Sequence, residues 1–175
     1  ADGRVRVGPD LRVADEVYVI GDPAGPQMST HLSHYQGEFA VRIALGEDVR
    51  PDYRAIPHAV YTDPEAAGVG LDLDGAIAAG FDAFEEVADL AMTAKGYVAE
   101  ATGHVTIVVD RKAQTLLGAF VAGPAASEVI HEAVLAIKTQ ATMDVLADTI
   151  HAFPTTARVM GGLFSQALVR LGSGA

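Results

Sequence analysis

Residues 150–160, which read IHAFPTTARVM, hold the side chains with the clearest chemical potential near the end of the sequence. His151 stands before a Phe153–Pro154 step, two threonines follow, and Arg158 comes shortly after them. Threonines placed ahead of an apolar run with helical spacing are typical N-cap residues. The segment is therefore a catalytic loop, an altered remnant of one, or only the start of a helix, and the elements around it must decide.

Glu128, His131 and Glu132 form a second group, spaced i, i+3 and i+4 so that they share one face of a predicted helix. A carboxylate-bridged pair of metal ions needs a further Glu-x-x-His from another helix. No second copy of that pattern occurs in the sequence. We therefore expect a solvated helix face here and no metal site.

Asp22 is the third candidate, because it follows a short β-branched and aromatic run, Val17–Ile20, that indicates a buried strand. An aspartate at the end of such a strand can hold ligand hydroxyls when it faces a helix N-terminus. A helix is predicted from Ser29 or Thr30 onward, and its free N–H groups suit an electron-rich ligand atom. The two features together predict half of a cofactor site.

Two further features are better explained by structure than by chemistry. Glu65 lies in a predicted turn, where a carboxylate is usually solvated or caps a helix. Gly68 and Gly70 resemble part of a glycine-rich nucleotide loop but lack the third glycine and the strand-to-helix turn that a dinucleotide site needs. Close backbone packing explains these glycines better.

The composition excludes several classes of protein. Half of the 175 residues are apolar, so a folded globular protein is expected, and a net charge of −11 argues against nucleic acid and anionic membrane surfaces as partners. No apolar run is long enough to span a bilayer, and the first residues lack a signal-peptide core, so we expect a soluble, cytoplasmic protein. The absence of cysteine excludes thiolate chemistry and disulfides within this sequence.

The pattern of predicted elements indicates an α+β fold, with an antiparallel sheet and helices on one face. A polar stretch between Gly46 and Ile56, with prolines at 51 and 57, predicts a boundary between units 1–50 and 51–175. Strands are predicted on both sides of an Asp63–Pro64 turn and at 84–90, 97–101, 104–109 and 115–121. Helices are predicted at 29–46, 72–81, 123–140, 142–150 and 155–172.

Three stretches, in the right order, resemble the pyridine nucleotide-disulfide oxidoreductases, the family of dihydrolipoamide dehydrogenase, glutathione reductase and mercuric reductase. VYVIGDPAG at 17–25 is similar to the family's flavin-binding aspartate motif, and IPHAVYTDPEAAGVGL at 56–71 is similar to the opening of its dimerisation domain. LLGAFVAGPAASEVIHEAVLAIKTQAT at 116–142 resembles a later segment of that domain. The resemblance implies that 1–50 is the C-terminal piece of an FAD-binding domain and that 51–175 is the dimerisation domain.

The resemblance also implies the roles of individual residues. Asp22 would bond a ribityl hydroxyl of FAD, and the helix start at Thr30 and His31 would direct backbone amides at the pyrimidine end of the flavin. Relatives with disulfide chemistry carry an acid–base histidine before the proline of the last loop and a partner glutamate five residues later. Phe153 and Arg158 occupy these positions here, so no catalytic residue of the usual dyad is intact. The carbonyl of Phe153 would still reach the flavin of the partner subunit, and His151 is a weaker candidate for a chemical role.

The implied function is an FAD-dependent oxidoreductase that takes hydride from NAD(P)H and acts as a homodimer. Its small-molecule electron acceptor is expected not to be a dithiol, and a quinone, a metal ion or another electrophile is more plausible. The sequence covers only the C-terminal part of such an enzyme and is expected to be a fragment or one part of the complete protein. The alternative is a non-enzymatic homodimerisation module.

Overall fold

The computed structural model describes residues 4–173, and the chain divides into two compact units, 1–53 and 54–175. The first unit contains a two-stranded antiparallel ribbon of β1 (Arg12–Ala14) and β2 (Val17–Tyr18), followed by helix α1 (Thr30–Ala44). Helix α1 begins and ends where predicted, because the Ser29 side chain caps its N-terminus and Gly46 follows its end with φ of 92°.

The predicted buried strand at Val17–Ile20 is wrong in extent and in burial. The strand has only two residues, and among the described residues β1 is its sole sheet neighbour. One neighbouring strand covers little surface, so Val17 stays 49% exposed and Ile20 39% exposed.

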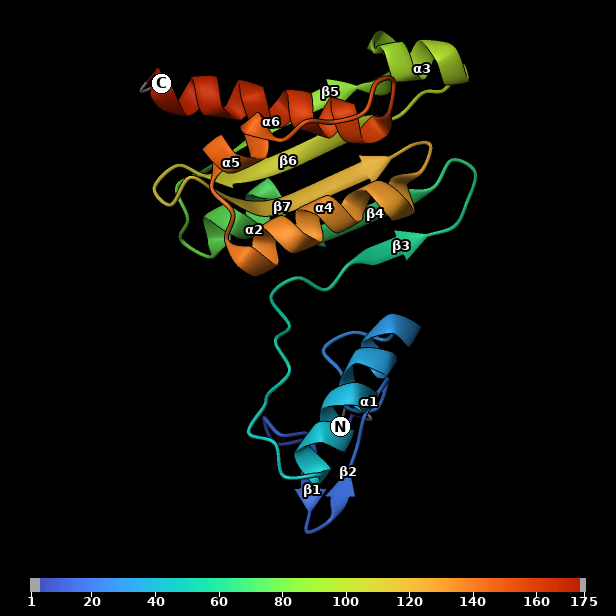
Figure 1. Cartoon of the computed structure of the whole chain (residues 1–175), viewed down its shortest axis with the longest axis vertical. Helices are drawn as coiled ribbons and strands as arrows, with labels where there is room; N and C mark the ends of the chain where they lie inside the picture. The colour runs from blue at the N-terminus through green and yellow to red at the C-terminus, as the bar shows by residue number, and fades with distance from the viewer. Residues whose placement is uncertain (1–3, 174–175) are drawn as a thin grey trace. The chain divides into compact units, whose positions relative to one another are not determined.

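The second unit is built on a five-stranded antiparallel sheet in the order β3-β4-β7-β6-β5 (Figure 1). The strands are β3 (His58–Val60), β4 (Ala66–Gly70), β5 (Ala83–Asp89), β6 (His104–Asp110) and β7 (Thr115–Ala122). β6 and β7 form the central hairpin, whose inward side chains are fully buried valines, isoleucine and alanine. The predicted antiparallel α+β architecture is confirmed.

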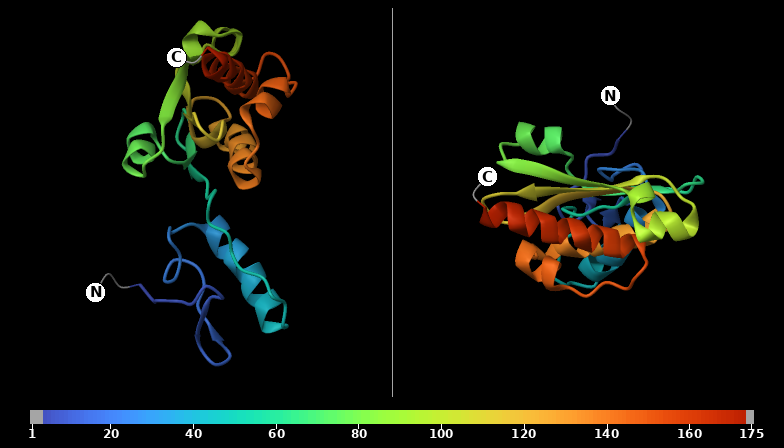
Figure 2. Two further views of the ribbon diagram at one scale, coloured as in Figure 1. Left: turned by 90° about the vertical axis from the view of Figure 1, so that its left-hand side faces the viewer. Right: turned by 90° about the horizontal axis from the view of Figure 1, so that it is seen from above.

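Three helices cover one face of this sheet (Figure 2). They are α4 (Ala126–Thr139), α5 (Met143–Asp148) and α6 (Thr156–Gly172). Helix α4 packs on β7 and β4, whereas α6 packs on β6 and β5. The core between helices and sheet includes Ile130, Met160 and Phe164, each at most 1% exposed. Met160 and Phe164 thereby pack α6 against the sheet.

Two short helices complete the unit, α2 (Leu73–Ala78) and α3 (Ala94–Ala99), with a 3-10 turn, η1 (Leu90–Met92), before α3. The strand predicted at 97–101 is wrong, because this segment belongs to α3 and the turn that ends it. The Thr93 side chain accepts a hydrogen bond from the Gly96 N–H and caps the helix, and Glu100 ends it in a left-handed conformation with φ of 49°. Local capping therefore outweighs the β propensity of Tyr97 and Val98.

Candidate functional site

Gln36 fixes the loop that presents Asp22 in the first unit. Its side chain is fully buried, and its Oε1 accepts a hydrogen bond from the Gly21 N–H at 2.7 Å while its Nε2 donates to the Tyr53 hydroxyl at 2.9 Å. Gly21 has φ of 76°, and a Cβ there would lie 2.9 Å from Ser33 Oγ. The loop therefore approaches α1 at a distance that favours glycine.

Asp22, next to that anchored glycine, is exposed, and its carboxylate makes no hydrogen bond or ion pair with the described residues. Thr30 and His31 lie in the first turn of α1 and are also exposed. Amides of a first helical turn have no acceptor within the helix. The structure thus presents, on one anchored loop and one helix start, the carboxylate and the helix terminus that the sequence predicted.

His151 is paired with Glu132 in the second unit. His151 Nε2 lies 2.7 Å from Glu132 Oε1, and the two side chains are 5% and 25% exposed. The imidazole packs against Phe164, with ring centroids 6.4 Å apart, and against Gly161, where a Cβ would lie 2.4 Å from Nδ1. Nδ1 is buried and has no partner among the described residues. This burial gives His151 little access to a substrate and ties the loop to α4.

Glu132 therefore does not belong to a solvated helix face, as predicted for it with Glu128 and His131. Those two side chains are exposed, whereas Glu132 turns toward the loop after α5. Across residues 4–173, no group of three or more His, Asp or Glu side chains is arranged to hold a metal ion.

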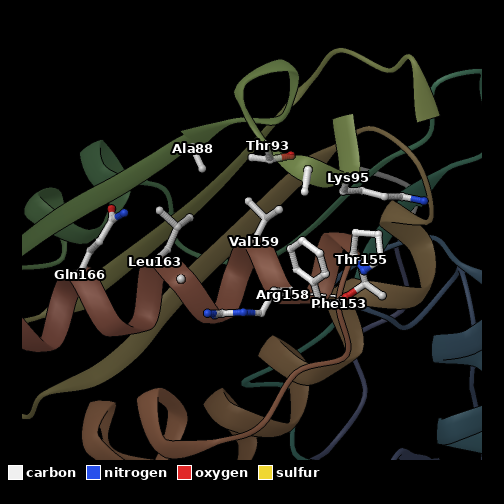
Figure 3. A pocket seen from close by; sticks show the side chains of 12 residues that line it. Ala88, Thr93, Lys95, Phe153, Thr155, Arg158, Val159, Leu163 and Gln166 are labelled. Atoms are coloured by element: carbon white, nitrogen blue, oxygen red, sulfur yellow. Dashed lines mark hydrogen bonds between the residues drawn. The ribbon is translucent and has the colours of Figure 1, made fainter. Parts of the chain in front are cut away.

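Phe153 lies in the loop before α6 and Arg158 in the first turn of α6 (Figure 3), the two positions at which the family resemblance implies an acid–base pair. The Phe153–Pro154 peptide bond is cis, and Phe153 is 74% exposed. The Thr155 hydroxyl accepts from the Arg158 N–H at 3.0 Å and donates to the Ala152 carbonyl at 2.6 Å, so it caps α6 and closes the loop. The Phe153 carbonyl accepts no hydrogen bond from any residue that the structure describes.

Glu65 caps a helix, as one of its two predicted interpretations has it. Its carboxylate accepts hydrogen bonds from the Ser127 N–H at 3.1 Å and the Ser127 hydroxyl at 2.8 Å, in the first turn of α4. These two bonds hold the pKa of the Glu65 carboxyl below its usual range. Its role is to join β4 to α4.

A match to a known family explains this arrangement of elements. Residues 56–163 match the model of the pyridine nucleotide-disulphide oxidoreductase dimerisation domain. The chain belongs to the pyridine nucleotide-disulphide oxidoreductases. Dihydrolipoyl dehydrogenase of Halobacterium salinarum is 42% identical over 159 residues, which are 88% of this chain and 33% of the relative. Dihydrolipoyl dehydrogenase of Thermus scotoductus is 39% identical over 81% of this chain and 31% of its own length.

Two solved structures share the fold of this chain. The crystal structure of LpdA from Mycobacterium tuberculosis superposes with a TM-score of 0.86 at 28% identity, over 93% of this chain and 36% of that chain. The flavoprotein disulfide reductase RclA from Escherichia coli, at 24% identity, gives a TM-score of 0.84 over 93% of this chain and 38% of that chain. The chain thus spans about a third of the length of the curated relatives it matches.

Two residues that matter in this family member escaped the sequence prediction. The sequence pattern predicts Gln36 only as part of α1 and Glu132 only as part of a solvated helix face. A polar residue at an inward-facing helical position is the signal that could have identified Gln36. The Glu132 partner, 19 positions away in sequence, gives no local signal. Along residues 4–173, no helix is long and apolar enough to cross a membrane.

Proposed function

We propose that this chain is the C-terminal part of an FAD-dependent oxidoreductase that takes hydride from NAD(P)H and passes electrons to an acceptor other than a dithiol. The family membership and the dihydrolipoyl dehydrogenase relatives support the flavoenzyme. The observation that carries the proposal on the acceptor is the Phe153–Arg158 pair at the start of α6.

The first unit, as the last piece of an FAD-binding domain, would bind the cofactor through three residues. Asp22, exposed on a loop anchored by Gln36, would accept a hydrogen bond from a ribityl hydroxyl. The amides at Thr30 and His31 would face the pyrimidine end of the isoalloxazine. Gly21, where a Cβ would crowd Ser33, lets this loop pass close to α1. FAD bound there would supply the two-electron chemistry that side chains lack.

The second unit would contribute its Phe153 carbonyl to the partner subunit's flavin. That carbonyl accepts no hydrogen bond among the described residues, so it is available as an acceptor. The hydrogen bonds of Thr155 to the Ala152 carbonyl and of His151 to Glu132 hold the surrounding loop and would fix the position of the Phe153 carbonyl.

The usual acid–base step toward a dithiol has no residue to perform it. A phenyl ring cannot transfer a proton, and a guanidinium cannot accept one near neutral pH. His151 cannot replace them in its observed position, because its side chain is 5% exposed and its Nε2 is bound to Glu132. Quinones, metal ions or other electrophiles, whose reduction at a flavin needs no such dyad, are the acceptors that this site favours.

Homodimerisation belongs to the same proposal. The name of the matching domain supports it, as do large apolar side chains left exposed on the helical layer. These are Leu135 at 63%, Ile150 at 97%, Phe153 at 74% and Val169 at 72%. Twofold association is the usual way in which such surfaces are buried.

The second candidate function is a non-enzymatic homodimerisation module. The observation that favours it is that the matched domain accounts for most of this chain and carries no intact catalytic dyad. Light scattering on the 175-residue chain is expected to give a dimer under both proposals, and a strict monomer at micromolar concentration would count against both.

The deciding experiment uses the intact protein that contains this chain. We expect a purified yellow flavoprotein that oxidises NAD(P)H with a quinone as acceptor. Its turnover of lipoamide should be at least about a hundredfold slower than its turnover of the quinone. The double variant Phe153→His/Arg158→Glu restores the dyad and should raise lipoamide turnover, with Arg158→Glu alone as the matched control. A colourless protein supports the module, and fast lipoamide turnover by the unaltered protein refutes the proposal on the acceptor.

A further inference from the structure

Two consecutive hydrogen bonds in the first unit join Gly21, Gln36 and Tyr53, and we call these three residues the Gln36 network. Gln36 Oε1 accepts from the Gly21 N–H at 2.7 Å, and Gln36 Nε2 donates to the Tyr53 hydroxyl at 2.9 Å. A peptide N–H can only donate, so the bond to Gly21 fixes which end of the amide carries the oxygen. The other end must then donate, and the Tyr53 hydroxyl is its acceptor.

Gly21 is the point at which this network reaches the loop of Asp22. Both main-chain polar groups of Gly21 are engaged, because its carbonyl accepts from the N–H groups of Ala24 at 3.0 Å and Gly25 at 2.8 Å. Asp22 lies inside the turn that these bonds close, and its exposed carboxylate has no hydrogen bond or ion pair with the described residues. The direction in which the Asp22 side chain leaves the turn therefore depends on where Gly21 is held.

Burial makes the Gln36 amide depend on both of its partners. The Gln36 side chain is fully buried, Gly21 is buried and Tyr53 is half-buried. Removal of one partner would leave a buried polar atom of the amide without a hydrogen bond, which is unfavourable. The amide would then turn toward another partner, and Oε1 would leave the Gly21 N–H. The Tyr53 hydroxyl thereby controls a hydrogen bond in which it takes no part.

Tyr35, the residue before Gln36 on α1, provides a comparison within the same cluster. Its hydroxyl accepts from the Asp52 N–H at 3.0 Å, and its ring lies edge-on to the ring of Tyr53 with centroids 6.4 Å apart. Tyr35 therefore holds the same segment of chain against α1, but its hydroxyl lies outside the Gln36 network. Loss of the Tyr35 hydroxyl should loosen this segment and leave the bond between Gln36 and Gly21 in place.

We propose that Gln36 and Tyr53 are positioning residues for FAD, because their hydrogen bonds hold Gly21, and with it Asp22, where the carboxylate can accept from a ribityl hydroxyl. The inference rests on the proposed function, in which Asp22 binds FAD. Neither Gln36 nor Tyr53 needs to touch the cofactor, since the effect passes through the main chain of Gly21. The affinity for FAD is thus set in part by a tyrosine that lies outside the aspartate motif.

Titration of the flavin-free complete protein with FAD, followed by flavin fluorescence, measures this effect. Tyr53→Phe and Gln36→Leu should each weaken FAD binding at least about tenfold. The double variant should lose less than about threefold more than the weaker-binding single variant, because both changes break the same network. Tyr35→Phe is the matched control, and it should lower Tm while changing FAD affinity by less than about threefold. Additive losses in the double variant overturn the inference.

Hydrogen exchange of the flavin-free protein follows the network without the cofactor. The Gly21 N–H should exchange at least about tenfold faster in Tyr53→Phe, and not in Tyr35→Phe. Gln36→Glu keeps an acceptor for the Gly21 N–H and can accept from the Tyr53 hydroxyl, so it should bind FAD more tightly than Gln36→Leu. Unchanged exchange at Gly21 in Tyr53→Phe, or equal FAD affinity of the two Gln36 variants, overturns the inference.

The same measurements separate this inference from the proposed function. A protein that binds FAD with an affinity that neither Tyr53→Phe nor Gln36→Leu changes refutes the positioning role and leaves the proposed function standing. A protein that binds no FAD refutes the proposed function, and the positioning role with it. Equal losses of FAD affinity in Tyr53→Phe and Tyr35→Phe refute the positioning role alone, because the effect is then a general loosening of the first unit.

Discussion

Truncation of Glu132 to alanine tests whether the buried His151–Glu132 pair holds the loop before α6. The substitution leaves an imidazole that is 5% exposed with neither ring nitrogen bonded to a described residue, since Nδ1 already lacks a partner. An unsatisfied buried polar group of this kind costs about 1–3 kcal/mol. In a chain of this size, 2 kcal/mol lowers Tm by roughly 4–8 °C.

Thermal and urea unfolding of the 175-residue chain, followed by circular dichroism, measures this loss. Glu132→Gln keeps an acceptor for the Nε2–H and should cost less than half as much as the alanine variant. Glu128→Ala, exposed on the same helix, is the control and should stay within about 1 kcal/mol, the upper value for its interaction with the helix dipole.

A double-mutant cycle isolates the pair itself. In a His151→Ala background the Glu132→Ala change no longer leaves an orphaned imidazole, so its cost should fall, with a coupling energy of about 1.5–3 kcal/mol. Additive single and double variants, or a Tm for Glu132→Ala within 1 °C of the unaltered chain, would falsify the reasoning.

Three further outcomes follow from contacts described above. Gly162→Ala should raise the free energy of unfolding by about 0.5–1 kcal/mol, measured by urea unfolding, because the added Cβ meets no atom within 4 Å; a loss of stability contradicts this. Gln36→Leu should lower it by about 1–3 kcal/mol by leaving the Gly21 N–H without its acceptor, and hydrogen exchange at Gly21 should quicken; unchanged exchange refutes the anchoring role. Ser127→Ala should raise the pKa of Glu65, read by NMR titration. The pKa of Glu65 is lowered in the folded state. The ionised Glu65 carboxylate therefore stabilises the fold above the ordinary glutamate pKa, and this stabilisation is lost as pH falls through the lowered pKa. The variant should therefore show a weaker loss of stability in acid, and an identical pH profile contradicts the assignment.

Much of the second unit could be predicted from the sequence, because its signals are local. Apolar runs at 104–109 and 115–121 on either side of the polar turn DRKAQ indicate a hairpin, and β6 and β7 form it. The segment 97–101 misled the prediction, because Tyr97 and Val98 favour a strand while Thr93 supplies the cap that starts a helix. The cap, Thr93, lies four positions before Tyr97. The composition of the segment 97–101 alone therefore does not reveal the helix.

The candidate site could be predicted only in part. Asp22, Phe153 and Arg158 are identified by motif and position, and the structure places Asp22 and Phe153 in exposed, anchored loops. The contact between His151 and Glu132 joins a loop to a helix across the fold, and no periodicity encodes it. A cleft of about 340 Å³ beside Phe153, lined by Lys95 and Arg158 (Figure 3), likewise arises from two segments that are far apart in the sequence.

Gly161 and Gly162 are neighbours on α6 with opposite environments. A Cβ on Gly161 would lie 2.4 Å from the imidazole of His151, whereas a Cβ on Gly162 would meet nothing within 4 Å. In a saturation library selected for folding, position 161 should therefore accept almost no replacement, while position 162 should accept many. This contrast between two adjacent positions would show that contact with the His151 ring, and not helix propensity, decides which residues α6 accepts.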